Sequence, residues 1–251
     1  MMKLITFKKL LLCSAILPFF AFASDKTTLI FSYGDYNAAP YAMESGEQLS
    51  SGIIKDIATE LGDELGFMVS FVRTPRKRIE RYLANNTSHI HLISNPAWLS
   101  HSEKFQWSDT LFIQKNRMVI NADNPNNYEK LADFKGMVIG TIRGYKYPTL
   151  QPFFDQGELI PYGVTTLSVN LIRLNLKRVD VVIDSNILIN YQLKQNNNNS
   201  AFKVLPIIVN EIDIKAALSA NAPITLEQFN QTLKKLKDQG VIDAMMKKYD
   251  I

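Results

Sequence analysis

Short apolar runs alternate with amphipathic segments along most of the chain. Residues 29–33 (LIFSY) are β-branched and aromatic and predict a strand, and apolar positions recur at helical spacing over 53–65. A strand over 67–72, a helix opened by Pro75 and a strand over 90–94 are expected next. This order of strands and helices predicts an α/β unit with a parallel sheet and crossover helices, whose ligands bind at the carboxyl ends of the strands.

A second unit of similar design begins near residue 116. Its expected elements are strands over 117–121, 137–142 and 179–183 and a helix from about Tyr147. Helical spacing over 225–237 and 241–249 predicts a C-terminal helical pair, and the asparagine run at 196–199 predicts an exposed loop tip.

The first 23 residues differ from the rest. Lys3, Lys8 and Lys9 precede an apolar run over 10–22, and Ala-Phe-Ala ends this segment at residue 23. Because the run is shorter than the ~20 residues that span a bilayer, the pattern predicts a cleaved signal peptide. The single cysteine of the chain lies within it, so the mature chain, 24–251, has none. We therefore expect a protein of the bacterial periplasm, an oxidising compartment.

Loss of the signal peptide changes the charge. It carries three of the 28 basic residues and none of the 24 acidic ones, so the mature net charge falls from +4 to 25 − 24 = +1. A nearly neutral chain gives no electrostatic reason to propose a nucleic-acid partner, and we expect none. At 251 residues and 46% hydrophobic content, the chain buries a core without disulfides or a metal.

Several segments resemble the bacterial extracellular solute-binding proteins, family 3, of the type that serves polar amino-acid ABC transporters. They occur in the family's order over nearly the whole mature chain. These segments are Ala39-Pro-Tyr41 with the glycine-led helix after Gly52, Trp107–Phe112, Asp133–Gly144, Val179–Asp184 and Phe229–Tyr249.

The resemblance implies an α/β fold of two lobes that close on a ligand in the cleft between them. Lobe 1 is expected to hold 24–114 plus 210–251, and lobe 2 to hold 115–209. The expected ligand is a small polar solute, an amino acid or a related carboxylate or amine, passed to an ABC permease or reported to a membrane sensor. We expect a monomer that needs no cofactor and is not an enzyme, because closure on a ligand requires only differential affinity.

One position departs from the family. An arginine of its T-x-x-R motif clamps the ligand carboxylate with two parallel hydrogen bonds, and the spacing from Trp107 places His101 there. Histidine is a weaker, pH-dependent anion partner. Arg76 and Arg78, beside Arg73 at the start of the Pro75 segment, are the candidate replacements. The alternative for both is a solvated helix face.

Lobe 2 offers the complementary group. The resemblance gives Asp184 the role of receiving the ligand's ammonium, and the alternative is an N-cap for the segment that follows. Gly144 and Tyr145 match the turn whose backbone NH groups bind carboxylate in the family; a structural turn is the alternative.

Aromatic and polar side chains near strand ends complete the candidate set. Tyr36, Tyr41, Trp98 and Trp107 could line the cleft, and we expect about two of them there and the others in the core. Asp35, Ser94 and Asn95 follow strands and offer hydrogen bonds, with turn or cap roles as the alternative.

No metal site is expected. His89 and His91 face one side of a strand, but no third ligand accompanies them, so we interpret them as ordinary strand residues. Motifs of nucleophilic or phosphate-binding enzymes are also lacking.

Two rival functions remain at this point. One is a periplasmic enzyme on the same fold, because some relatives resemble dehydratases of prephenate-like acids, and His101 or Asp184 could serve as its acid or base. The other is an interaction protein that uses the closed lobes as a platform.

Overall fold

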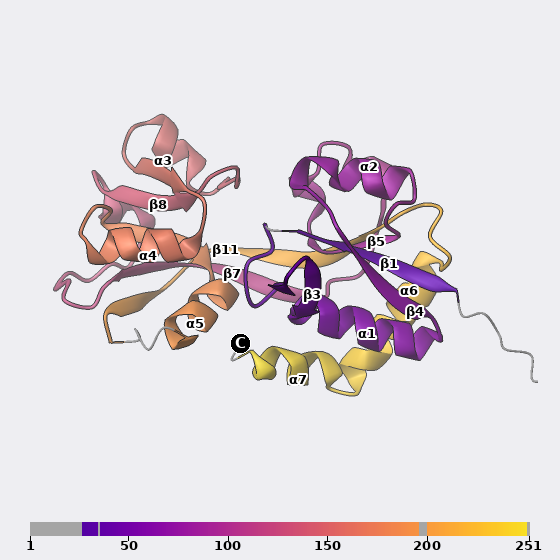
Figure 1. Cartoon of the computed structure of the whole chain (residues 1–251). Helices are drawn as coiled ribbons and strands as arrows, with labels where there is room; N and C mark the ends of the chain where they lie inside the picture. The colour runs from indigo at the N-terminus through magenta and orange to yellow at the C-terminus, as the bar shows by residue number, and fades with distance from the viewer. Residues whose placement is uncertain (1–26, 35, 196–199, 250–251) are drawn as a thin grey trace, which may run out of the picture.

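The computed structural model describes residues 27–34, 36–195 and 200–249, and this part of the chain forms two α/β lobes joined by long strands (Figure 1). The predicted signal peptide, Asp35 and the asparagine run at 196–199 lie outside the described residues.

Lobe 1 combines the beginning and the end of the chain. Three helices, α1, α6 and α7, lie on one side of its strands, and α2 lies on the other (Figure 1). The elements are β1 (Thr28–Tyr33), β2 (Met43–Ser45), β3 (Gln48–Ser51), α1 (Ile53–Leu65), β4 (Met68–Arg73), α2 (Ile79–Ala84), β5 (Ile90–Ser94), β6 (Gln106–Trp107), α6 (Leu226–Asp238) and α7 (Val241–Lys248).

Lobe 2 holds the middle of the chain. Its elements are β8 (Val138–Ile142), α3 (Gln151–Asp155), β9 (Ile160–Val164), α4 (Leu167–Asn175), β10 (Val181–Ser185) and α5 (Asn186–Gln195). Val182 packs in a cluster with α4 and α5, whereas its neighbours Val181 and Ile183 pack in the cluster that contains Phe134 and Leu150. This alternation follows from the two-residue period of a strand and places apolar layers on both faces of the sheet.

Two strands pass through both lobes: β7 (Phe112–Asn121) and β11 (Phe202–Leu218). They pair antiparallel from Phe202 opposite Asn121 to Ile214 opposite Phe112. The predicted boundaries at 114/115 and 209/210 fall inside this ladder, so the residue at which each lobe begins stays a prediction.

The sheet is mixed, which corrects the expectation of a parallel sheet. Its strand order is β4-β1-β5-β11-β7-β10-β8-β9. The pairs β1–β4, β1–β5, β8–β9 and β8–β10 are parallel as expected. The two connecting strands are antiparallel to β5 and β10, because a chain that crosses to lobe 2 and returns must run in both directions.

Local signals account for several boundaries. α1 follows Gly52 and ends at Gly66, whose left-handed φ of 74° closes the helix with backbone hydrogen bonds, as the spacing predicts. The Pro75 prediction is wrong in detail: Pro75 is extended and precedes a 3₁₀ turn over Arg76–Arg78, and α2 begins only at Ile79. The helix expected from Tyr147 likewise begins later, at Gln151.

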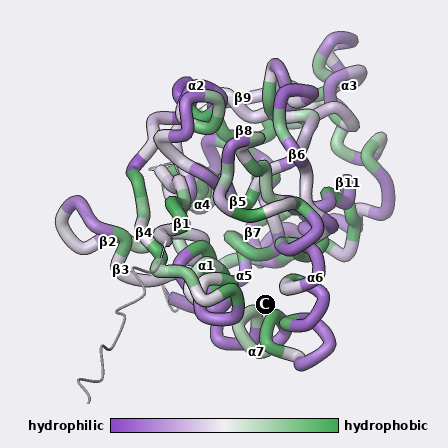
Figure 2. The backbone as a smooth tube through the Cα atoms, turned by 90° about the vertical axis from the view of Figure 1, so that its right-hand side faces the viewer, coloured by the Kyte–Doolittle hydropathy of each residue, from purple (hydrophilic) through white to green (hydrophobic). Residues whose placement is uncertain are grey.

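The core follows the hydropathy of the chain. Figure 2 shows hydrophobic segments in the interior strands, such as β5, and hydrophilic ones on outer turns. In lobe 1, Phe31, Ile57, Leu92 and Phe229 are fully buried in one cluster, so β1, β5, α1 and α6 are fixed against one another. This rigidity holds the loops that carry the candidate site.

Candidate functional site

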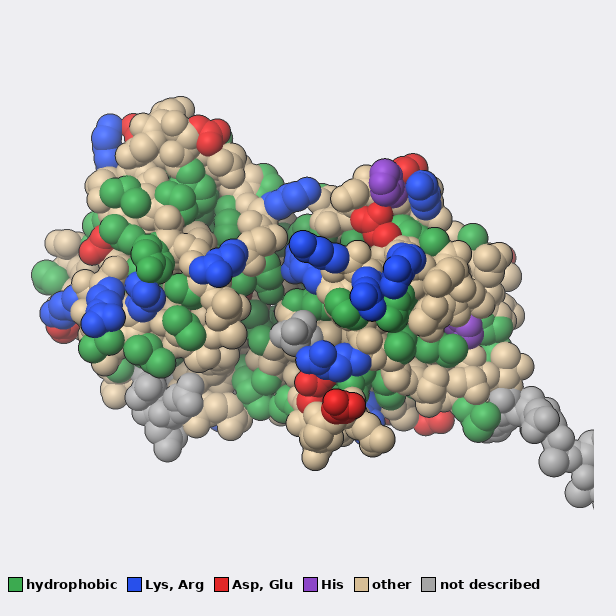
Figure 3. Space-filling model, turned by 45° about the horizontal axis from the view of Figure 1, so that its top comes forward, with side chains coloured by type: hydrophobic (Ala, Val, Ile, Leu, Met, Phe, Trp, Pro, Cys, Tyr) green, Lys and Arg blue, Asp and Glu red, His purple; other side chains and the backbone are tan. Residues whose placement is uncertain are grey.

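The candidate site lies where loops of the two lobes face each other. Lobe 1 contributes the loop after β1 and the 3₁₀ turn at Arg76, and lobe 2 contributes the turn after β8 and the end of β10. These loops follow the carboxyl ends of strands, where ligands of α/β folds bind. The surface is hollowed between the lobes, with Lys and Arg side chains on both sides of the hollow (Figure 3).

Asp184 is a buried acid, and one of its two carboxyl oxygens has no hydrogen-bond partner among the described residues. It is the fourth residue of β10, is 5% exposed, and accepts a hydrogen bond at Oδ1 from the Ser185 amide, 2.8 Å away. Oδ2 is buried and has no hydrogen-bond partner among the described residues. Burial raises the pKa of Asp184 to about 7, against the lowering effect of the Ser185 amide.

The capping role that was the alternative for Asp184 belongs to its neighbour. Ser185 Oγ accepts a hydrogen bond from the Leu188 amide at 3.1 Å, in the first turn of α5. Asp184 is therefore not needed to satisfy the helix, and its free oxygen favours a ligand role.

Arg76 spans the gap between the lobes. Its guanidinium carbon is 6.0 Å from the centroid of the Tyr36 ring in lobe 1 and 5.3 Å from that of the Tyr145 ring in lobe 2. Both distances are in the range of cation–π contact. Arg76 is exposed and forms no ion pair within the described residues, so its hydrogen-bond donors are available to an anion.

Tyr145 connects Arg76 with Asp184. Burial and the negative charge of Asp184 raise the pKa of Tyr145 to about 12, while Arg76 lowers it. The phenol thus lies within electrostatic range of both the acid and the cation and stays neutral.

Gly144, one residue earlier, has a φ of +83°, and a Cβ there would meet nothing within 4 Å. The glycine serves the left-handed turn that presents Tyr145, and the Tyr145 amide is used by the Ile142 carbonyl at 3.1 Å. The structural alternative for Gly144 and for the Tyr145 amide is therefore favoured.

Three other candidates are engaged in packing or turns. Tyr41 is buried, and its hydroxyl donates to Gln114 Oε1 on β7 at 2.7 Å; burial raises its pKa. Asn95 Oδ1 accepts from the Ala97 amide at 2.9 Å, and its Nδ2 donates to the Asp213 carbonyl on β11. Trp98 packs against the lobe 1 core. These positions favour structural roles, including the turn that was the alternative for Asn95.

The remaining lobe 1 candidates differ in exposure. Ser94, the last residue of β5, is 2% exposed. Trp107 donates from Nε1 to the Ser102 carbonyl at 2.9 Å and packs in a small cluster with Tyr36. Arg78 is exposed at the start of α2 and forms no ion pair within the described residues.

His101 points toward solvent. Its side chain is 59% exposed, and its Nδ1 lies 3.7 Å from Glu103 Oε1. A neighbouring carboxylate competes with a bound anion, so this geometry favours Arg76 over His101 as the replacement for the family arginine.

His91 was missed as a candidate. It is 2% exposed in β5, its Nδ1 lies 2.9 Å from Ser32 Oγ, and its ring centroid is 6.2 Å from that of Tyr36. Burial, then Arg76, lower its pKa to about 4, against the raising effect of a hydrogen bond between the imidazole and the Ser32 backbone. A neutral histidine thus lies under the tyrosine that contacts Arg76.

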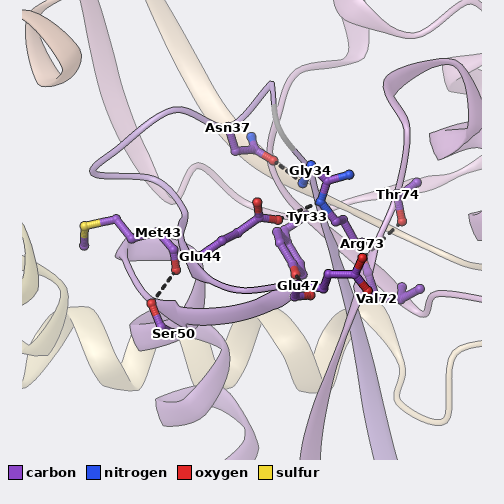
Figure 4. A network of polar contacts seen from close by, with 10 residues as sticks. All are labelled: Tyr33, Gly34, Asn37, Met43, Glu44, Glu47, Ser50, Val72, Arg73 and Thr74. Carbon is purple, nitrogen blue, oxygen red and sulfur yellow. Dashed lines mark hydrogen bonds and ion pairs between the residues drawn. The ribbon is translucent and has the colours of Figure 1, made fainter.

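A polar network fixes the β2–β3 hairpin beside the gap (Figure 4). Arg73 Nε lies 2.7 Å from Glu44 Oε1, and the Tyr33 hydroxyl donates to the Glu47 carbonyl at 3.2 Å. From the hairpin, Met43 Sδ accepts a hydrogen bond at 3.4 Å from the Tyr191 hydroxyl of lobe 2. Arg73 is therefore held on the hairpin, and the hairpin itself reaches the second lobe.

No group of three metal-ligating side chains occurs among the residues the structure describes. His89 Nδ1 accepts from the Ile30 amide at 3.2 Å, which is the structural role expected of a strand histidine.

Two α/β lobes joined by two shared strands form the fold of the two-lobed periplasmic binding proteins. The chain belongs to the bacterial extracellular solute-binding proteins, family 3, whose model matches residues 32–250.

Solved structures repeat the fold. An ancestral arginine-binding protein bound to arginine matches with a TM-score of 0.71 and 19% identity, over 90% of this chain and 99% of that one. The GluR0 ligand-binding core with L-glutamate matches with a TM-score of 0.73 and 16% identity, over 90% and 99%. The ancestral amino acid-binding protein AncCDT-1, a precursor of cyclohexadienyl dehydratase, matches at 0.67 and 18%, over 88% and 94%. No curated protein sequence matches this chain.

Proposed function

We propose that the mature protein binds a small zwitterion of the amino-acid type in the cleft between its lobes. The observation that carries this proposal is the arrangement around Tyr145. Asp184 on one side has an oxygen without a partner, and Arg76 on the other has no carboxylate within the described residues. A solute with one ammonium and one carboxylate satisfies both groups at once.

Each group has a defined role in this proposal. Asp184 receives the ammonium, and the ion pair makes its proton leave because a cation lowers the pKa of a buried acid. Arg76 takes the carboxylate in place of the family arginine, while Tyr36 and Tyr145 hold the guanidinium from two sides. Arg78 is exposed two residues away and contributes charge rather than direct contact.

Closure follows from the placement of these groups on different lobes. A solute that touches both lobes binds the closed state more tightly than the open one and shifts the population toward it. We place the hinge where β7 and β11 pair, near Gln114 opposite Ile212 and Asn116 opposite Asn210, which agrees with lobes of 24–114 plus 210–251 and 115–209.

The cellular role extends from the family. We propose a periplasmic monomer, exported by residues 1–23, that delivers its solute to an ABC permease or reports it to a membrane sensor. The family of extracellular solute-binding proteins supports this location. Among the described residues, the longest helices, α1 and α6, have 13 residues each, and no helix qualifies as a membrane span.

A thermal-shift screen of residues 24–251 against amino acids, diacids, amines and aromatic acids tests the proposal. A ligand at about 100 times its dissociation constant adds ~2.7 kcal/mol and raises the melting temperature by several degrees. We expect at least one amino acid to do so, and the shift to be clearly smaller in both Asp184→Asn and Arg76→Ala at the same ligand concentration. A panel with no shift for any amino acid, carboxylate or amine overturns the proposal.

One observation also favours an enzyme. An acid whose pKa is raised to about 7 can give or take a proton at neutral pH, as a dehydratase requires. Incubation with prephenate-type acids tests this second candidate. Aromatic product that is lost in Asp184→Asn supports the enzyme, and the absence of product excludes this reaction, so that binding remains the one proposed function.

A further inference from the structure

Five exposed cations lie on the two turns that meet between the lobes, which we call the opening of the cleft. Arg76, Lys77 and Arg78 form the 3₁₀ turn of lobe 1, and Arg143 and Lys146 lie in the turn of lobe 2 that also holds Tyr145. The two turns meet: Arg76 contacts the Tyr145 ring, and Lys146 Nζ is 3.5 Å from the Ala97 carbonyl of lobe 1. Figure 3 shows basic side chains on both sides of the hollow.

These five cations are not neutralised within the described residues. Several cations elsewhere on the two lobes are paired with acids: Arg73 with Glu44 at 2.7 Å, Lys135 with Glu158 at 2.9 Å, and Lys177 with Asp123 at 2.9 Å. Around the opening, in contrast, Arg143 binds the Gly163 carbonyl at 3.3 Å and Lys146 binds the Ala97 carbonyl. Carbonyl oxygens leave the positive charge in place, so the potential at the opening is positive.

The acids near the opening do not balance this charge. Glu80 Oε1 accepts a hydrogen bond from the Ser100 amide at 2.6 Å, Glu103 lies beside His101, and Asp184 is buried within electrostatic range of Tyr145. Among the described residues, five cations thus face three acids, Glu80, Glu103 and the buried Asp184, so an excess of positive charge remains between the lobes.

We propose that the solute of this cleft is net anionic and carries two carboxylates on a short aliphatic skeleton. The inference rests on the proposed function and narrows it. One carboxylate binds Arg76, and the second faces the cations of the opening, where Lys146 and Arg143 are the lobe 2 groups. An amine on the same skeleton reaches Asp184, which makes an acidic amino acid; a diacid without an amine shares the other contacts.

Isothermal titration of residues 24–251 compares L-glutamate, L-aspartate, glutarate and succinate with L-glutamine and L-arginine. We expect an acidic ligand to bind at least about tenfold more tightly than L-glutamine and L-arginine, and its affinity to fall as the salt concentration rises from about 20 to about 300 mM. L-Glutamate against glutarate shows whether the amine contributes. If L-glutamine or L-arginine binds as tightly as the acids, this inference is overturned and the proposed function stands. If none of the six ligands binds, this inference is likewise overturned, and the wider thermal-shift panel decides whether the proposed function fails with it.

A charge reversal locates the effect. Lys77→Glu changes the opening without touching the Arg76 or Asp184 contacts, and Lys203→Glu, exposed on β11 opposite Ile120, makes the same charge change away from lobe 1. We expect Lys77→Glu to lower the association rate of L-glutamate about fivefold and that of a neutral amino acid by less than about 1.5-fold, with Lys203→Glu near the wild type. Equal effects of the two variants would mean that only net charge matters and would overturn the inference.

Discussion

The guanidinium carbon of Arg76 in lobe 1 lies 5.3 Å from the centroid of the Tyr145 ring in lobe 2. A contact with an aromatic face restrains the guanidinium without using up its hydrogen-bond donors. The cation is therefore positioned by the protein, yet no carboxylate of the described residues pairs with it, as expected of a group that binds a ligand carboxylate.

Removal of this cation should abolish most of the binding. We expect Arg76→Ala to weaken the affinity for a carboxylate ligand by about 10- to 100-fold, since a charged hydrogen bond contributes roughly 1.5–3 kcal/mol. Arg76→Lys should recover part of the loss, because the charge remains and the paired geometry does not. Arg81→Ala, an exposed arginine of α2 that stacks on Tyr82, is the matched control and should bind as the wild type does. Equal affinity for wild type and Arg76→Ala would exclude Arg76 from the site.

Asp184 should make the fold less stable as the pH rises. Its pKa is raised from 3.8 to about 7 on folding, so the folded chain holds a proton that the unfolded chain has lost. The stability from that proton is complete below pH 4 and is lost by pH 7, a change of at most about 4 kcal/mol. We expect Asp184→Asn to be more stable than the wild type at pH 8 and to differ little at pH 4, as measured by urea unfolding. The exposed Asp63→Asn is the control, and a variant that is destabilised at pH 8 contradicts the account.

His91 should make the fold more stable as the pH rises, the opposite of Asp184. Its pKa falls from 6.5 to about 4 on folding, so the unfolded chain binds the extra proton and stability rises by about 3 kcal/mol between pH 4 and 6.5. In the wild type, the pH-dependent contributions of Asp184 and His91 to stability have opposite signs and partly cancel. Stability should therefore rise over this range in Asp184→Asn and fall in His91→Asn, whose amide can still hydrogen-bond to Ser32. If stability changed with pH in the same way in both variants, Asp184 and His91 would not be the groups that set the pH dependence of unfolding.

His101 should be dispensable. Its side chain is exposed and faces Glu103, so we expect His101→Ala to change ligand affinity by less than about twofold at pH 5.5 and at pH 8. A loss of binding confined to the lower pH would instead restore the histidine as the anion partner.

Regular local patterns made much of the fold predictable. The spacing that ends at Gly66 predicts α1 because its signals lie within one helix. β11 escaped prediction because it is 17 residues long, contains a proline and shifts its register twice, so only its pairing with β5 and β7 defines it as a strand. α4 and α5 were also missed. Asn170 is buried in α4 and donates to the Thr141 carbonyl, a polar contact that breaks the apolar pattern.

The sequence predicts those site residues that can be recognised from their type and their place in a motif. Asp184 was identified from its motif, and the loss of an arginine at His101 pointed to the Arg76 segment. The sequence could not choose between Arg76 and Arg78, because only the placement of the second lobe shows which of the two lies against Tyr145. His91 was treated as an ordinary strand residue because its approach to Tyr36 arises only when β5 pairs with β1.

Proton release on binding tests the central claim most directly. Titration calorimetry at pH 6.5 in two buffers of different ionisation enthalpy counts the protons that leave when an amino acid binds. With a pKa of about 7, Asp184 is about three-quarters protonated at this pH, and an ammonium displaces that proton. We predict a release of about 0.7 proton per ligand in the wild type and none in Asp184→Asn. Tight binding of an amino acid with no proton release in the wild type would contradict the assignment of Asp184 as the receptor of the ligand's ammonium.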